Sequence, residues 1–106
     1  MAYTYHVDFT VENAQMEQFQ IGAALEKVVG YLRTLLPNQP GFITARGMHS
    51  LDGTGATHLV VQSMWDQWDD LKAHQDSGLA EQKVLAEFGP HVSADHLSVR
   101  IYEEVA

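Results

Sequence analysis

The chain opens with a regular alternation of apolar and polar residues. The apolar or aromatic positions are Tyr3, Tyr5, Val7, Phe9 and Val11. Because successive side chains of a strand point to opposite faces, this period of two is typical of a strand with one buried face. Residues 3–11 are therefore predicted to form the first strand of a sheet.

The spacing of apolar residues then changes to three and four, which is the period of an amphipathic helix. This spacing holds from Ile21 to Leu36. Pro37 is expected to end the helix, because proline has no backbone N–H to donate. Asn13 is the expected N-cap, since its side chain can accept a hydrogen bond from the first turn.

Two β-rich segments, 42–50 and 57–65, lie on either side of a glycine-containing turn, which predicts an antiparallel hairpin. We centre the turn on Gly53 and Thr54. One face then holds Phe42 with Trp65, Thr44 with Ser63, Arg46 with Val61 and Met48 with Leu59. The other face holds Ile43 with Met64, Ala45 with Gln62, Gly47 with Val60 and His49 with His58. Both faces are substantially apolar in this register.

Two short helices over 66–74 and 79–88 and a last strand over 96–103 complete the pattern. The order strand, helix, strand, strand, helix, strand predicts an α+β class fold of the ferredoxin-like βαββαβ type, with an antiparallel sheet in a single domain over 1–106. A sheet with two apolar faces needs two covers, and the helices of one small domain cover only one face. We therefore expect a homodimer in which a second copy supplies the other cover.

Composition and charge narrow the possible partners. The 106 residues include no cysteine, so the protein needs no oxidising compartment and the cytoplasm is the expected location. The formal net charge is -8 and the six Lys and Arg residues are scattered, which disfavours nucleic acid as a partner. No apolar stretch approaches about 18 residues, so we predict neither a signal peptide nor a membrane span.

Several segments in the middle of the chain resemble a known family. They are the run Pro40-Gly41-Phe42-Ile43-Thr44-Ala45-Arg46, the run Ser50-Leu51-Asp52-Gly53, and Trp65 followed by Leu71, His74 and Ser77. Together they resemble the antibiotic biosynthesis monooxygenase family of dimeric α+β barrels. The resemblance implies that two chains pack sheet against sheet with their helices outside, and that each subunit holds a pocket between its sheet and its own helices.

Members of this family include cofactor-independent oxygenases of polycyclic phenols and quinols, haem-degrading enzymes, and proteins with no assigned activity. The chain departs from two of these patterns. Quinone-forming members carry an Asn four residues before the conserved Trp, where this chain has Val61. Haem-degrading members carry an iron-binding His on the later helix, and residues 79–83 contain none. We therefore expect no cofactor.

The candidate catalytic residues are His74, Trp65 and Arg46. His74 is the candidate general base, because imidazole titrates near neutral pH and can take a proton from a phenol. Trp65 can stack on a flat aromatic substrate and donate its N–H, and Arg46 can stabilise a developing oxyanion. The structural alternatives are an anchoring role for Trp65, a solvated helix position for His74 and an ion pair of Arg46 with Asp8. The expected substrate-binding residues, which the resemblance assigns to the pocket, are Phe42, Met48, Val61 and Leu71.

A metal site is an alternative interpretation of the histidines on the predicted strands. His49 and His58, opposed in the predicted hairpin, combine with His6 and Asp8 into a set of ligand types that suits zinc or another divalent ion. Histidines on a subunit-facing side are also explained as hydrogen-bonded interface residues, and we predict no metal.

The leading functional hypothesis is a homodimeric, cofactor-independent monooxygenase that acts on a small aromatic or quinol-like molecule. The alternative is a non-catalytic small-molecule-binding or stress-related barrel protein, which the apolar Val61 favours. An isomerase or decarboxylase is a further possibility, because the same base and oxyanion donor can serve enolisation.

Overall fold

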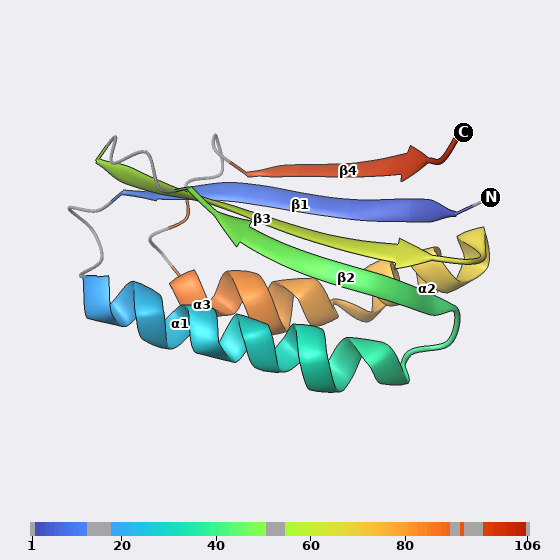
Figure 1. Cartoon of the computed structure of the whole chain (residues 1–106), viewed down its shortest axis with the longest axis horizontal. Coiled ribbons are helices and arrows are strands. Elements are labelled where there is room, and N and C mark those ends of the chain that lie inside the picture. Colours follow the sequence, from blue (N-terminus) through green and yellow to red (C-terminus); the bar gives the residue numbers. More distant parts are fainter. Residues whose placement is uncertain (1, 13–17, 51–54, 90–91, 93–96, 106) are drawn as a thin grey trace.

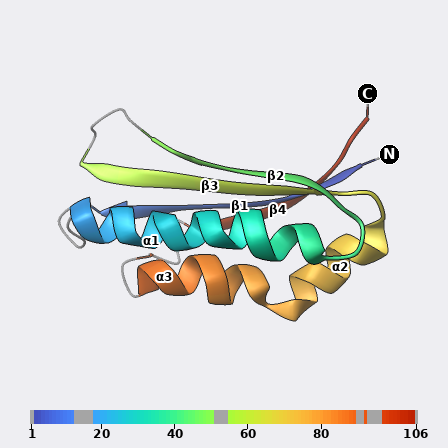
Figure 2. The ribbon, with the colours of Figure 1, turned by 60° about the horizontal axis from the view of Figure 1, so that its bottom comes forward.

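The computed structural model describes residues 2–12, 18–50, 55–89, 92 and 97–105. They form two layers, a four-stranded sheet and a layer of helices packed against one of its faces (Figure 1). After rotation the helices lie together under the sheet, and within the described residues the other face carries no helix (Figure 2). We call these the covered face and the open face.

The sheet has the order β2-β3-β1-β4, and all neighbouring strands are antiparallel. The strands are β1 (Tyr3–Glu12), β2 (Phe42–His49), β3 (Ala56–Trp65) and β4 (Ser98–Glu103). One helical segment connects β1 to β2 and a second connects β3 to β4. The predicted ferredoxin-like βαββαβ fold is therefore confirmed.

The two central strands, β1 and β3, carry the buried side chains of the covered face. The alternation predicted for β1 is confirmed, because its odd-numbered positions from Tyr5 to Val11 are all buried. The buried side chains of β3 are those of Leu59, Val61, Ser63 and Trp65. Three of these four are apolar, so Ser63 is a buried polar position in an otherwise hydrophobic row.

The first helical segment runs under the sheet in three parts. α1 (Gln18–Gly30) continues into the π-helical turn η1 (Tyr31–Leu35) and the 3₁₀ turn η2 (Leu36–Asn38). Backbone geometry becomes extended at Gln39, so the predicted end of the helix near Pro37 is confirmed. The expected cap Asn13 lies outside the described residues.

The second helical segment begins with α2 (Trp68–Ser77), which ends at Gly78 in the left-handed region with φ 71°. It continues through η3 (Glu81–Leu85) to α3 (Ala86–Phe88). The two helices predicted over 66–74 and 79–88 are therefore present, and the first lies slightly further along the chain than predicted.

The predicted hairpin register is wrong beyond its first pair. Phe42 lies opposite Trp65 as predicted, but an irregularity between Phe42 and Thr44 shifts the rest of β2 by one residue. Arg46 consequently pairs with Gln62. A shift of one residue turns every later side chain to the opposite face, because the side-chain period of a strand is two. The predicted centre of the turn, Gly53 and Thr54, lies outside the described residues.

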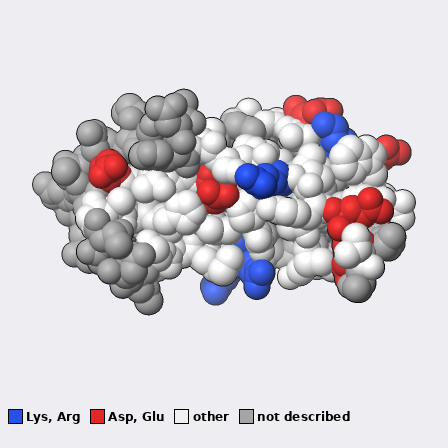
Figure 3. All heavy atoms as spheres, turned by 90° about the horizontal axis from the view of Figure 1, so that it is seen from above, with Lys and Arg blue, Asp and Glu red and all other residues white. Residues whose placement is uncertain are grey.

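The corrected register changes the character of the open face. Its side chains include Thr4, His6, Asp8, Thr10, Arg46, Met48, His58, Gln62, Met64 and Tyr102. The face is thus mixed, whereas the sequence suggested a substantially apolar one. Viewed from the side of the sheet away from the helices, basic and acidic groups lie close together within a largely uncharged surface (Figure 3). In the described part of the chain, no helix has the length and apolar character needed to cross a bilayer.

Candidate functional site

A buried cluster of rings lies between the covered face and the helices. It joins Trp65 at the end of β3, His74 in α2 and Tyr31 at the start of η1. The Tyr31 hydroxyl oxygen lies 2.9 Å from Nε2 of His74. The rings of Trp65 and His74 are stacked, with centroids 4.8 Å apart and an interplanar angle of 25°. The structure therefore brings together two of the three predicted catalytic residues and adds a tyrosine.

The chain reverses direction between Trp65 and His74, and two local features hold this turn. The backbone N–H of Asp66 donates to the carbonyl oxygen of Gly41 at 2.9 Å, and α2 begins two residues later. Leu71 and His74 are three residues apart and so lie on one face of α2, where both are buried. The rings of Trp65 and His74, which are nine residues apart in sequence, are thereby brought into contact.

Burial decides between the two interpretations of His74. Only 3% of the residue is exposed, so the interpretation as a solvated helix residue is wrong. Burial disfavours the charged form of an imidazole, and a neutral ring can accept a proton. Tyr31 is similarly buried, and which of the two residues donates in their hydrogen bond depends on the His74 tautomer. In the tautomer whose Nε2 carries no proton, the pair can pass a proton from the phenol to the imidazole.

The indole of Trp65 is held entirely within the protein. Its side chain is fully buried, and its Nε1–H donates to the Ser63 hydroxyl at 2.9 Å. The ring of Phe42 packs edge-on against it at 5.7 Å between centroids. This arrangement matches the anchoring interpretation of Trp65, because its single N–H already has an acceptor within the sheet.

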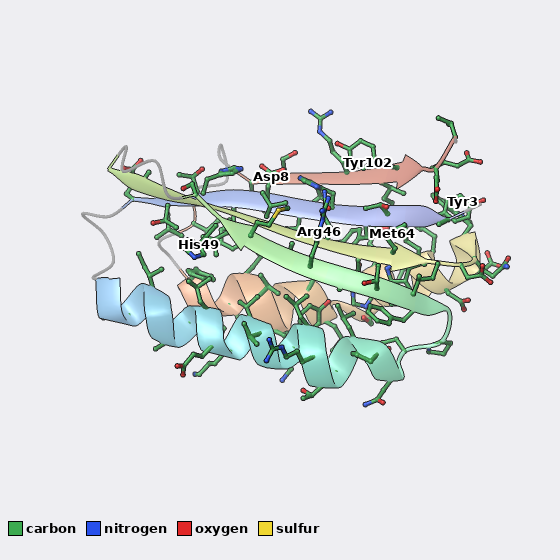
Figure 4. All side chains as sticks on the ribbon, in the orientation of Figure 1. Tyr3, Asp8, Arg46, His49, Met64 and Tyr102 are labelled. Carbon is green, nitrogen blue, oxygen red and sulfur yellow. The ribbon has the colours of Figure 1, made fainter. Side chains whose placement is uncertain are left out.

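Arg46 and Met48 do not lie where the predicted register placed them. Both belong to the open face because of the shift in β2, away from Trp65 and His74. Arg46 Nε donates to Oε1 of Gln62 at 2.8 Å, so its partner is this amide and not the Asp8 carboxylate of the structural alternative. Figure 4 shows Arg46 reaching over the sheet, on the side away from the helices.

Two cavities border the covered face. An apolar pocket of about 230 Å³ lies between α1 and the β2 edge of the sheet. Its lining includes Leu25, Val28, Leu32, Gly47, Met48, Leu59 and Val61. A smaller cavity of about 10 Å³, enough for about one water molecule, is lined by Tyr5, Tyr31, Val61, Ser63 and Val84 among others. Val61 lines both cavities and is the common wall between the pocket and the Tyr31 side.

Sequence reasoning missed Tyr31 and Ser63. Tyr31 follows Val28 at a spacing of three, so the pattern identifies it only as another core residue of the helix. Ser63 had a signal, because it is polar at a position where the alternation of β3 demands an apolar residue. The π-helical turns η1 and η3 contribute Tyr31 and Val84 to the same small cavity, and such turns frequently occur at functional sites.

The alternative metal site depends on the predicted register. The corrected register no longer places His49 opposite His58. His49 pairs with Leu59 on the covered face, whereas His58 lies on the open face. His6 and His58 do approach Asp8, at 2.7 Å and 3.5 Å from its carboxylate oxygens. Among the residues that the structure describes, no group of three His, Cys, Asp or Glu side chains is arranged to hold a metal ion.

Comparison with known proteins places the fold. No protein-family model matches the sequence, and no curated protein matches it in sequence. A solved structure described as a "putative antibiotic biosynthesis monooxygenase" from Deinococcus radiodurans aligns with a TM-score of 0.70 at 14% identity, over 100% of this chain and 94% of that chain. A dimeric protein of unknown function and ferredoxin-like fold from Bacteroides fragilis aligns with a TM-score of 0.73 at 14% identity, over 97% and 96% of the two chains.

SnoaB, a cofactor-independent oxygenase from Streptomyces nogalater, aligns with a TM-score of 0.58 at 14% identity, over 97% of this chain and 92% of its own. Identities this low establish a shared fold and leave the reaction open. The chain therefore has a ferredoxin-like α+β fold. Solved structures with this fold are named as antibiotic biosynthesis monooxygenases, the family that the sequence resembles.

Proposed function

We propose that this protein is a homodimeric monooxygenase that oxidises a small aromatic, quinol-like compound without a cofactor. The observation that carries the proposal is the buried hydrogen bond between Tyr31 and His74. Only the side chain of Val61 separates the cavity beside Tyr31 from the apolar pocket. The description of SnoaB as a cofactor-independent oxygenase supports the same reaction class. The lack of cysteine is compatible with a cytoplasmic location.

The apolar pocket suits the substrate class. Ligand pockets usually enclose roughly 300–1,000 Å³ and are lined mainly by hydrophobic side chains. At about 230 Å³ this pocket suits a compound of one or two rings. Gly47 helps to keep it open, because a Cβ there would lie 3.0 Å from Cδ1 of Leu32.

Access of the substrate to Tyr31 and His74 depends on the side chain of Val61. Its side chain lines the pocket on one side and the small cavity beside Tyr31 on the other. A change of the Val61 rotamer joins the two spaces and lets the substrate hydroxyl reach the Tyr31 oxygen. Tyr31 then supplies the polar group that the apolar residue at position 61 does not.

The reaction needs one proton acceptor and molecular oxygen. The substrate phenol gives its proton to Tyr31 as Tyr31 passes its own to Nε2 of His74. The phenolate is electron-rich enough to reduce O₂, and the carbon para to its oxygen, which must carry a hydrogen atom, forms a C–O bond to the reduced oxygen. Loss of water from the resulting hydroperoxide leaves a quinone. One oxygen atom enters the product and one leaves as water, and the substrate supplies all the electrons.

The assembly proposed here uses the open face. Met48 and Tyr102 are large side chains on that face that are 43% and 47% exposed. The structurally similar protein from Bacteroides fragilis is described as dimeric. A second copy packed on this face would cover Tyr102 and the exposed part of Met48, which also borders the pocket between α1 and β2.

Oxygen uptake tests the proposal. The purified protein is supplied with 1-naphthol and, separately, with 2-methoxyphenol, each of which carries hydrogen on the carbon para to its hydroxyl, and uptake is measured above the autoxidation background. Tyr31→Phe removes the proton-carrying hydroxyl and His74→Gln removes the acceptor, so we expect each to lower turnover by about 10²-fold or more. Tyr3→Phe removes a phenol hydroxyl outside the site and serves as the matched control.

Two outcomes would oppose the proposal. Uptake that stays at background with both compounds, or uptake that is unchanged in Tyr31→Phe and His74→Gln, excludes this pair as the proton acceptor. Tight binding of the reduced compounds without any turnover would instead support the non-catalytic binding protein, which the apolar Val61 also favours.

A further inference from the structure

The apolar pocket between α1 and β2 carries one polar side chain. Its lining includes His49, the last residue of β2. Among the described residues that line the pocket, His49 is the only one whose side chain contains a nitrogen or oxygen atom. Pockets of this kind use a small number of placed polar groups to orient a bound molecule. His49 is therefore the side chain that can distinguish between flat ligands of the same shape.

The corrected register of β2 brings His49 to this pocket. His49 pairs with Leu59, whose side chain is buried on the covered face. Directly opposed residues of an antiparallel pair lie on the same face of the sheet. Figure 4 shows His49 near the end of β2, on the side of the sheet that faces the helices. The irregularity that moves Arg46 to the open face thus moves His49 to the covered face.

A backbone contact determines which ring nitrogen of His49 can accept a hydrogen bond. Nδ1 of His49 lies 3.3 Å from the carbonyl oxygen of Ser50. A carbonyl oxygen only accepts, so Nδ1 carries the proton in this contact. The neutral ring then has an unprotonated Nε2, which is a hydrogen-bond acceptor. Nε2 makes no hydrogen bond with any residue that the structure describes.

His49 and Val61 lie at the two ends of the wall that β2 and β3 contribute to the pocket. Val61 pairs with Gly47, whereas His49 pairs with Leu59, so the two ends are two residues apart along the strands. Each residue of a strand advances about 3.4 Å, which separates the two ends by about 7 Å. A ring bound with its reacting hydroxyl directed past Val61 therefore has its far edge toward His49.

We propose that His49 sets the substrate class of the pocket, which is a two-ring phenol with a second hydroxyl on the ring remote from the reacting one. Nε2 of His49 accepts a hydrogen bond from this second hydroxyl, and the first hydroxyl is directed past Val61 to Tyr31. This inference rests on the proposed oxygenase function and names the substrate of the same site. His49 takes no part in the proton transfer. It lies on the covered face and so outside the surface assigned to the second copy.

Calorimetric titration in the absence of oxygen tests the proposal in the whole protein, because no ligand is then turned over. The ligands are 1-naphthol, naphthalene-1,6-diol and 6-methoxy-1-naphthol. The diol is expected to bind about three- to tenfold more tightly than 1-naphthol, which is the gain from one added hydrogen bond. The methoxy compound has an oxygen at the same place without a hydrogen to donate. It is expected to bind no more tightly than 1-naphthol.

Three variants identify the residue that accepts from the second hydroxyl. His49→Leu removes the acceptor and keeps an apolar side chain, so the diol and 1-naphthol are expected to bind within about twofold of each other. His49→Gln restores an acceptor oxygen and is expected to keep part of the preference. His58→Leu makes the same substitution on the open face and is the matched control, which is expected to keep the full preference. Each preference is a ratio of two affinities in one variant, so a change in overall affinity cancels.

The proposal is overturned if the diol and 1-naphthol bind equally to the unchanged protein, if the methoxy compound shows the same gain as the diol, or if His49→Leu keeps the preference. Failure of all three ligands to bind overturns it as well. Oxygen uptake with 1-naphthol separates this proposal from the oxygenase activity. Uptake that depends on Tyr31, without a preference for the diol, refutes only the role of His49. A preference that depends on His49, in a protein without uptake, refutes only the oxygenase and supports this ligand specificity in a binding protein.

Discussion

The two faces of the sheet each hold a histidine in a chain of hydrogen-bonded groups, and their surroundings differ completely. On the covered face, His74 is buried and stacked on Trp65, with Tyr31 as its phenol partner. On the open face, His6 lies between Gln62 and Asp8 in a row of polar side chains. One imidazole is enclosed by rings and the other by hydrogen-bonding groups.

This difference in surroundings suggests different roles for His74 and His6. His74 is buried beside aromatic rings, which shields its imidazole from water. The polar row around His6 fixes hydrogen-bond directions and so orients Arg46. The same residue type can thus serve acid–base chemistry on one face and positioning on the other.

The largest expected contrast lies in the aromatic residues of the two faces. Trp65→Ala removes a fully buried indole, and we expect the free energy of unfolding to fall by about 3–5 kcal/mol. Tyr102→Ala removes a ring that is 47% exposed and should cost less than about 1 kcal/mol in the monomer. Urea denaturation measures both. Equal losses in the two variants at a concentration where the protein is monomeric would contradict the comparison.

Gly41 tests the turn that brings Trp65 and His74 together. Its φ of 76° is strained for other residues, and a Cβ there would collide with the Asp70 side chain at the start of α2. Gly41→Ala is expected to destabilise the protein by about 2 kcal/mol. The matched control is Gly22→Ala in α1, where a Cβ meets nothing within 4 Å. That helical substitution should stabilise by about 0.5–1 kcal/mol, and destabilisation of similar size in both variants would refute the explanation.

The Tyr31 hydroxyl is expected to contribute somewhat less. Tyr31→Phe deletes its hydrogen bond to a buried imidazole, and we expect the free energy of unfolding to fall by about 1–2 kcal/mol. Thermal unfolding and urea titration give the value. An unchanged stability would mean that the Tyr31–His74 hydrogen bond does not hold the two helical segments together.

The smallest expected effect is on the open face. Gln62→Leu breaks the link between Arg46 and His6, yet in the monomer these groups can turn to water, so the loss there should stay below about 1 kcal/mol. The same urea titration measures it. At a concentration where the protein is monomeric, a loss larger than that of Tyr31→Phe would contradict this ranking of the two faces.

The sequence predicted the features that depend on periodicity. The alternation of residues 3–11 gave the correct buried face of β1, and the spacing after Trp65 placed His74 on the following helix. These inferences succeed because each depends on the regular period of a single element. The ferredoxin-like order followed from the succession of the elements.

The features that the sequence did not reveal arise from irregular backbone and from tertiary contacts. The irregularity between Phe42 and Thr44 moved Arg46 to the open face. The sequence pattern did not reveal this shift of one residue, because it is compatible with either register. Tyr31 was missed because its helical spacing only predicts burial. Its role depends on His74, which is distant in sequence and meets it through packing of the two helical segments.

The position of a bound reduced substrate tests the central claim most directly. We expect a crystal structure with 1-naphthol to show the ring between α1 and β2, the Val61 side chain turned aside, and the substrate hydroxyl within hydrogen-bonding distance of the Tyr31 oxygen. A ligand found only on the open face, or one in the apolar pocket with its hydroxyl directed away from Tyr31, would contradict the proposed role of the Tyr31–His74 pair.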